Sequence, residues 1–171
     1  MSLHNPVSSA DNVQGNAHAH IVLVEYGDYE CPHCGAAYPI VKKLQSHFGN
    51  KLLFVFRNFP LTEIHPHALA AAYVAESAAA QGKFWPVHDL IFEHQNQLSV
   101  KSLLSYATKS GVDIAQLEED MTSDAVINKV ETDIEGGLRS GVNGTPTFFV
   151  NGKRYEGDYE YEAFKEFLEA I

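Results

Sequence analysis

The only two cysteines of this chain lie in the tetrapeptide Cys31-Pro32-His33-Cys34. Thiols at this spacing can form a reversible disulfide, supply half of a metal site, or be a chance pair of core residues. Two cysteines are too few for a disulfide scaffold, and two thiolates alone cannot complete a four-ligand structural zinc site. A zinc site would need histidines, for which the candidates are His18, His20, His65 and His67.

The position of the pair favours redox chemistry, because it falls where a predicted buried strand turns into a predicted helix. The free N–H groups and the dipole at a helix N-terminus stabilise a thiolate, and Pro32 is tolerated in the first helical turn. We therefore expect Cys31 to be the attacking sulfur and Cys34 to be the more buried, resolving sulfur. The His33 side chain is predicted to be the main group that favours the Cys31 thiolate.

Two other positions could take part in the chemistry. Glu25 stands inside an apolar strand, so burial should raise its pKa, and it is either paired structurally or acts as a proton carrier. Gly144-Thr145-Pro146 opens a later apolar run. A proline cannot donate to a sheet ladder. Pro146 therefore either begins the strand in the ordinary trans form or forms a cis peptide that turns the strand edge toward a ligand.

The elements that must position these residues follow a β-α-β, helical block, β-β-α order. An apolar, β-branched run predicts a strand buried on both faces, and Asn-Gly between two short apolar runs predicts a hairpin. Ser99 and Asp113 are predicted helix N-caps, and either Ser123 or Asp124 is predicted to cap a further helix. The predicted strands are 20–26, 51–59, 145–150 and 153–155, and the predicted helices include 31–48, 67–81, 84–94, 100–110 and 159–171.

This order indicates an α/β fold with a helical insertion. We expect residues 1–19 to be an irregular N-terminal arm, residues 20–60 and 142–171 to form one domain, and residues 61–141 to form the insertion. The insertion should end in a helix with an apolar stripe from Val126 to Leu138, whose last turn is weakened by two consecutive glycines.

Composition excludes several classes of protein. With 12 Lys and Arg against 22 Asp and Glu, the net charge of −10 gives little attraction to nucleic acid or to anionic lipid. No apolar run approaches the roughly 20 residues of a membrane span. The first 19 residues lack the basic and apolar regions of a signal peptide. We expect a periplasmic or other extracytoplasmic protein if a leader has been removed, and otherwise a cytoplasmic one.

From about residue 20 onward, the chain resembles the DsbA-like thiol:disulfide oxidoreductases of the thioredoxin superfamily. The resemblance is carried by the CPHC motif, an acidic residue six positions before its first cysteine (Glu25), a proline five positions after its second (Pro39), and the GTPT segment before FFVNGK. It implies a thioredoxin fold with an inserted helical domain. It also implies that Pro146 is cis, that Thr145 and Pro146 pack against the cysteines, and that Glu25 accepts the proton of Cys34.

The resemblance implies a dithiol oxidase that exchanges its disulfide with protein or peptide thiols and is recycled by a redox partner. Neither a metal nor an added cofactor is expected, because the disulfide is the redox group. The backbone before Pro146 would bind an extended substrate segment as an added strand. The alternatives are a reductase or isomerase on the same fold, a redox-sensing binding module, and a glutathione-using enzyme of the kappa-transferase type, against which the intact cysteine pair argues.

Overall fold

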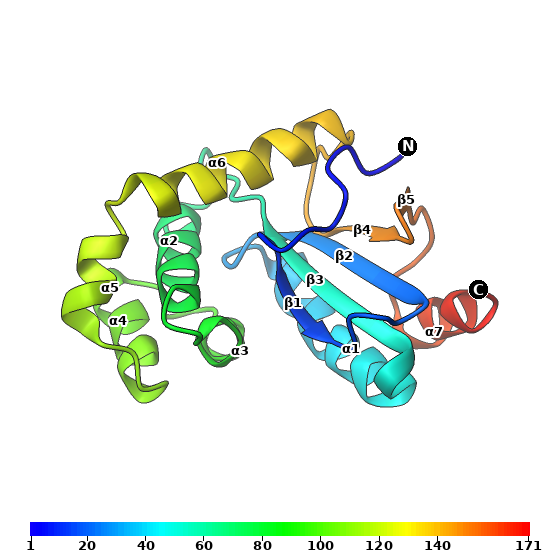
Figure 1. The fold of residues 1–171 in the computed structure, drawn as a ribbon, viewed down its shortest axis with the longest axis horizontal. Coiled ribbons are helices and arrows are strands. Elements are labelled where there is room, and N and C mark those ends of the chain that lie inside the picture. Colours follow the sequence, from blue (N-terminus) through cyan, green and yellow to red (C-terminus); the bar gives the residue numbers. More distant parts are fainter.

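A five-stranded sheet in the order β1-β3-β2-β4-β5 forms the centre of the fold in the computed structural model, which describes residues 1–171 (Figure 1). The two central strands, β2 and β3, are parallel, and the other neighbours are antiparallel. The predicted strands are therefore confirmed, with ends shifted by one or two residues. The strands are β1 (Asn12–Gly15), β2 (Ile21–Gly27), β3 (Leu52–Asn58), β4 (Thr147–Val150) and β5 (Lys153–Arg154).

Helices cover one face of this sheet, and the cysteines lie where the central strand β2 leads into the first of these helices. Helix α1 (Pro32–Phe48) connects β2 to β3, and α7 (Tyr161–Glu169) packs beside α1. Leu23 on β2 belongs to the large core on this side, whereas Val24 and Tyr26 belong to a smaller core on the opposite face. Both faces of β2 and β3 are buried, which explains why their sequences are almost continuously apolar.

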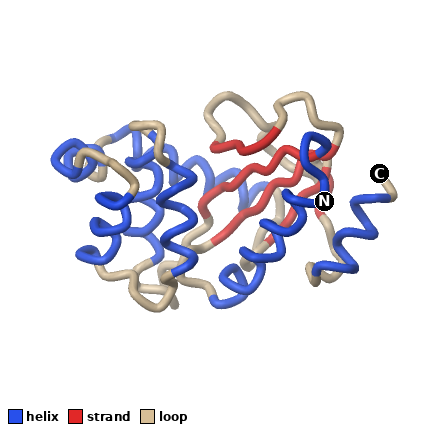
Figure 2. The backbone as a smooth tube through the Cα atoms, turned by 90° about the horizontal axis from the view of Figure 1, so that it is seen from below, coloured by secondary structure: helices blue, strands red, loops and turns tan.

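Five helices are inserted between β3 and β4 (Figures 1 and 2). The first four gather to one side of the sheet, and the fifth, which is long, runs from them back toward β4 (Figure 1). Three of them begin at the predicted N-caps, Ser99, Asp113 and Ser123, whose side chains accept a backbone N–H three residues later. None of the helices combines the length and the apolar character needed to cross a membrane. The inserted helices are α2 (Ala68–Ala79), α3 (Phe84–Glu93), α4 (Val100–Lys109), α5 (Ile114–Asp120) and α6 (Asp124–Arg139).

The N-terminal arm (residues 1–19) is not wholly irregular, which corrects the sequence expectation. Its residues 12–15 form β1, which pairs antiparallel with β3. The side chains of this strand offer no apolar alternation: Val13 is 41% exposed, and Asn12 donates to Glu76 at 2.7 Å. The strand is held by backbone pairing to the edge of β3 and by polar contacts, so an apolar pattern could not reveal it.

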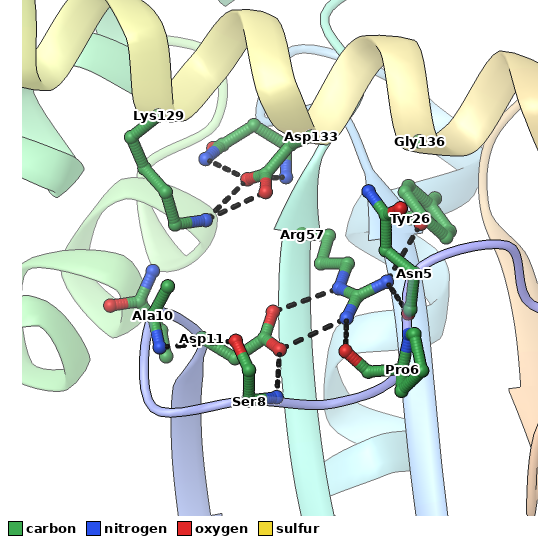
Figure 3. A network of polar contacts seen from close by, with 12 residues as sticks. Asn5, Pro6, Ser8, Ala10, Asp11, Tyr26, Arg57, Lys129, Asp133 and Gly136 are labelled. Carbon is green, nitrogen blue, oxygen red and sulfur yellow. Dashed lines mark hydrogen bonds and ion pairs between the residues drawn. The ribbon is translucent and has the colours of Figure 1, made fainter.

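Arg57, on β3, binds the arm to the sheet through a buried guanidinium group (Figure 3). It forms a two-pronged ion pair with Asp11, with N–O distances of 2.8 and 2.9 Å. It also donates to the Tyr26 hydroxyl at 2.9 Å and to the carbonyls of Asn5 and Pro6 at 2.9 and 3.3 Å. The arm therefore covers the face of the sheet opposite α1.

Candidate active site

The two cysteines lie at the first turn of α1, directly after the loop that follows β2. Cys31 is the N-cap residue and Pro32 occupies the first helical turn. Cys31 is 4% exposed and Cys34 is fully buried, and both are free thiols in this structure. The sequence prediction that Cys34 is the more deeply buried of the two sulfurs is therefore confirmed.

The surroundings of the two sulfurs give them opposite proton affinities. A hydrogen bond from the Cys34 side chain is the largest contribution that lowers the pKa of Cys31, to about 5, and it outweighs the opposing effect of burial. The backbone N–H groups of Cys34 and His33 lower it further. The pKa of Cys34 is raised, first by burial, then by its hydrogen bond to Cys31 and by the charge of Glu25. Cys31 is therefore a thiolate at neutral pH while Cys34 keeps its proton.

His33 contributes to this arrangement through its backbone N–H rather than through its ring. The ring is exposed to solvent and forms no hydrogen bond to either sulfur. The main stabilising group is instead Cys34 itself. A further role of the His33 ring in setting the redox potential stays a prediction.

Glu25 lies on β2, opposite Phe56 of β3 and Phe148 of β4. Its carboxyl group is buried and its Oε1 atom has no hydrogen-bond partner. Burial, followed by the negative charge of Cys31, raises its pKa to about 8. The carboxyl group can therefore gain and lose a proton near neutral pH, and its charge is felt by Cys34.

The loop before β4 meets Cys31 from the other side of the site. The Thr145–Pro146 peptide bond is cis, and the Cys31 sulfur lies 3.5 Å from the Thr145 carbonyl oxygen. The buried Oγ1 atom of Thr145 has no hydrogen-bond partner within the fold. Beside Gly144 the space is open, since a side chain there would touch nothing within 4 Å. The structure thus brings together Cys31 and Thr145, two residues of the predicted site that are far apart in the sequence.

Three residues around the cysteines were not assigned to redox chemistry by the sequence. Asp28 donates its backbone N–H to the Cys34 sulfur at 3.4 Å, and its carboxylate binds the ring of His65 at 2.7 Å. Gln95, from the loop between α3 and α4, donates to the Cys31 carbonyl at 2.6 Å. No short-range motif marks the contacts of His65 and Gln95, because they join segments that are distant in the sequence.

The histidines considered as zinc ligands lie in other arrangements. His65 and His67 each bind a carboxylate, Asp28 and Glu30 respectively, with nitrogen–oxygen distances of 2.7 Å. In residues 1–171 there is no group of three or more His, Cys, Asp or Glu side chains placed to hold a metal ion.

A cysteine pair at the start of a helix that follows a buried strand, in a sheet with inserted helices, defines a thioredoxin-like oxidoreductase. A family model described as "Thioredoxin" (Thioredoxin_4) matches residues 8–170. The chain therefore belongs to this thioredoxin family, and its fold is the DsbA-like one with inserted helices.

Solved structures support this assignment over almost the whole chain. Oxidised BdbD from Bacillus subtilis is 25% identical, with a TM-score of 0.87 over 99% of this chain and 96% of that one. A thioredoxin-like oxidoreductase from Silicibacter pomeroyi is 26% identical, with a TM-score of 0.85 over 95% and 92% of the two chains. The predicted thioredoxin fold with a helical insertion is confirmed, whereas the domain boundaries at residues 60 and 142 stay a prediction.

Similar curated sequences are parts of much longer proteins. The Na(+)/H(+) antiporter NhaA 1 of Salinispora arenicola is 44% identical over 153 residues, which are 90% of this chain but 23% of that protein. An antiporter of the same name from Mycobacterium sp. (strain KMS) is 42% identical over 99% of this chain and 28% of its own length. The chain thus spans about a quarter of the length of these relatives.

Proposed function

We propose that this protein is a thiol:disulfide oxidoreductase that transfers a Cys31–Cys34 disulfide to protein or peptide thiols. The observation that carries the proposal is the contrast between the two sulfurs, because Cys31 has a pKa of about 5 and that of Cys34 is raised. A stabilised thiolate stabilises the reduced protein and so makes the disulfide a stronger oxidant. This contrast favours the oxidase direction.

In the oxidase direction, a substrate thiolate attacks Cys31 of the Cys31–Cys34 disulfide. A sulfur–sulfur bond forms between the substrate and Cys31, the Cys31–Cys34 bond breaks, and Cys34 leaves as a thiolate that takes up a proton. A second substrate thiolate then attacks the substrate sulfur and releases Cys31 as a thiolate. The substrate loses two electrons to the cysteine pair, and a redox partner must reoxidise that pair.

The loop before β4 is the proposed binding site for the substrate backbone. An extended peptide that adds to the edge formed by Gly144, Thr145 and Pro146 would place its cysteine next to Cys31, because the Thr145 carbonyl already lies 3.5 Å from this sulfur. The open space beside Gly144 leaves this edge accessible to a second chain.

Turnover tests the proposal. When oxidised glutathione is supplied, the wild-type protein should accelerate oxidative refolding of a reduced protein whose native form contains disulfides. Its activity in insulin reduction should be weaker than its activity in this refolding assay. A measured midpoint potential near that of strong dithiol oxidants would agree with the oxidase direction. Failure to turn over in either assay would contradict the proposed enzyme.

Glu25 is the proposed proton acceptor in the reverse reaction, the reduction of a substrate disulfide. In that reaction Cys34 loses its proton and attacks the mixed disulfide between Cys31 and the substrate. Only the carboxylate form can accept the Cys34 proton, so the rate of this step should rise with pH through about 8, the pKa of Glu25. Glu25→Gln should slow the step about 100-fold and remove this rise. Stopped-flow measurement of a single turnover with a peptide disulfide would show both effects.

Glu30→Gln is the matched control, because the Glu30 carboxylate binds His67 and neither sulfur, so the substitution should leave the pH profile of the rate unchanged. Stability gives a second measurement. Since burial raises the pKa of Glu25, the fold loses stability as pH rises from about 4.5 toward 8, and Glu25→Gln should be more stable than wild type at pH 9. A Glu25→Gln protein with the wild-type pH profile would exclude the proton-acceptor role.

A reductase or isomerase role uses the same chemistry in the opposite direction. The structure of the site is compatible with both directions, and the measured midpoint potential separates them, because each 30 mV corresponds to about 1.4 kcal/mol for two electrons.

A redox-sensing module is the second candidate function, and the antiporter relatives favour it. In such a role, oxidation of the cysteine pair would alter an interaction with a transport protein of this type without turnover of protein thiols. A cysteine pair that is oxidised and reduced by glutathione, yet catalyses neither oxidative refolding nor insulin reduction, would support the sensing role over the oxidoreductase.

A further inference from the structure

Asp28 occupies a position from which its backbone contacts both cysteines. Its N–H donates to the Cys34 sulfur at 3.4 Å, and its carbonyl accepts the N–H of Cys31 at 3.1 Å. A donor to a sulfur favours the anionic form, and the Asp28 N–H is the group that lowers the otherwise raised pKa of Cys34. Its placement therefore matters whenever Cys34 carries negative charge, either as a leaving group or as a nucleophile.

The Asp28 carboxylate fixes the peptide that carries this N–H. The residue is 1% exposed, and its side chain accepts three hydrogen bonds. One comes from the backbone of Glu30 at 2.8 Å, and one from the backbone of Leu61 at 2.8 Å. The third comes from the ring of His65 at 2.7 Å. The last two donors belong to the segment between β3 and α2, so this carboxylate joins that segment to the loop that carries the cysteines.

His65 is the one side-chain donor of these three. Since an ionised carboxylate only accepts, Nδ1 of His65 must carry the proton in this contact. The ring is largely buried, with 16% of its surface exposed. Burial opposes its charge, but the hydrogen bond and the charge of Asp28 prevail and raise its pKa, which keeps the donor in place. The backbone turn that carries His65 is fixed by a hydrogen bond from the His65 N–H to the Leu61 carbonyl at 2.9 Å.

We propose that Asp28 and His65 are positioning residues for the resolving cysteine: the His65 ring fixes the Asp28 carboxylate, which holds the Asp28 N–H on the Cys34 sulfur. Neither residue touches the substrate, and the pair acts through Cys34 alone. The inference rests on the proposed thiol-disulfide exchange, because a Cys34 thiolate forms only when the disulfide is opened. It also assigns a function to the first of the two histidines in the sequence His65-Pro66-His67.

The test measures how fast reduced glutathione opens the Cys31–Cys34 disulfide, because a small thiol does not depend on the peptide-binding edge. His65→Leu removes the donor and should slow this reaction about tenfold, the effect of losing one hydrogen bond to a charged group. His65→Asn keeps a donor close to the position of Nδ1 and should restore the rate to within about twofold of wild type. Urea unfolding of each variant would verify that it is folded.

His67→Leu is the matched control. It removes a more exposed contact of equal length to a carboxylate, that of Glu30 at 2.7 Å, and the Glu30 side chain does not bond to either sulfur. We expect it to react with glutathione at the wild-type rate. If His65→Leu does not fold, Asp28→Asn makes the same test, because its amide replaces an acceptor with a donor and should also slow the opening.

Three outcomes would overturn the inference. His65→Leu could react as fast as wild type, His67→Leu could be slowed equally, or His65→Asn could remain as slow as His65→Leu, which would mean that ring charge rather than the hydrogen bond matters. These outcomes are independent of the proposed function. A wild-type protein that reacts with glutathione but does not turn over protein substrates would remove the enzyme and leave the positioning pair testable.

Discussion

Replacing Cys31 with serine should abolish thiol-disulfide exchange, leaving no turnover above the uncatalysed background. Serine cannot form the sulfur–sulfur bond on which each step depends, and its hydroxyl does not ionise near neutral pH as the Cys31 thiol does with its pKa of about 5. Oxidative refolding and insulin reduction would both be measured. If Cys31→Ser were as active as wild type, Cys34 or another group would be the nucleophile.

Cys34→Ser is the matched variant, and it should behave differently. Cys31 remains able to attack a substrate disulfide, but no second sulfur can resolve the product, so mixed disulfides accumulate and can be quantified on non-reducing gels.

The Cys31→Ser variant also tests the electrostatic contact between Cys31 and Glu25. Because the charge of Cys31 helps to raise the pKa of Glu25, that pKa should fall below about 8 in Cys31→Ser. An unchanged Glu25 titration would contradict the contact between these groups.

The strands and helices with strong periodic patterns could be predicted from the sequence. β2 and β3 are marked by continuous apolar runs because helices and the N-terminal arm bury both of their faces. The N-caps Ser99, Asp113 and Ser123 are marked by residue type, because a short polar side chain at that point satisfies a free backbone N–H. In each case the pattern itself lies within a few consecutive residues, so the local sequence carries the signal.

Helix α6 shows where this reasoning fails. The predicted apolar stripe is confirmed at Val126 and Val130, which are buried, but its last member, Leu138, is 61% exposed. The buried face instead turns toward Asp133 and the two glycines. A side chain at Gly137 would lie 2.8 Å from the Phe59 ring, so the absence of side chains there lets the helix pass close over the sheet. Gly136 and Gly137 therefore support packing rather than merely weaken the last turn.

The site divides in the same way. Cys31 and Cys34 could be found because their spacing and the helix start are local features. The placement of Thr145 beside Cys31 was implied only by the family resemblance. Asp28 could not be assigned, because its role comes from a contact with His65, 37 residues away in the chain. The sequence shows which groups have reactive chemistry, whereas the folded structure shows which polar groups orient them.

Arg57→Met should destabilise the fold more than any surface substitution, by about 3–5 kcal/mol, because it leaves a buried carboxylate without its partner. The pair is deeply buried, with 4% of the Arg57 side chain and 5% of the Asp11 side chain exposed. Loss of the guanidinium also removes the donors to the Tyr26 hydroxyl and to two carbonyls of the N-terminal arm (Figure 3). Urea unfolding at pH 7 would measure the loss.

Two controls and the pH dependence make this stability prediction specific. Arg139→Met breaks an exposed ion pair with Glu135 and should cost at most about 1 kcal/mol, while Arg57→Lys keeps the charge and should fall between the two.

Burial raises the pKa of Asp11, but the hydrogen bonds and charge of Arg57 outweigh it, so the net shift is downward. The stability from this shift is present above about pH 4 and is lost as the pH falls further. The cost of Arg57→Met should therefore shrink in acid, and a cost that equals that of Arg139→Met, or that does not change with pH, would exclude this role for the buried pair.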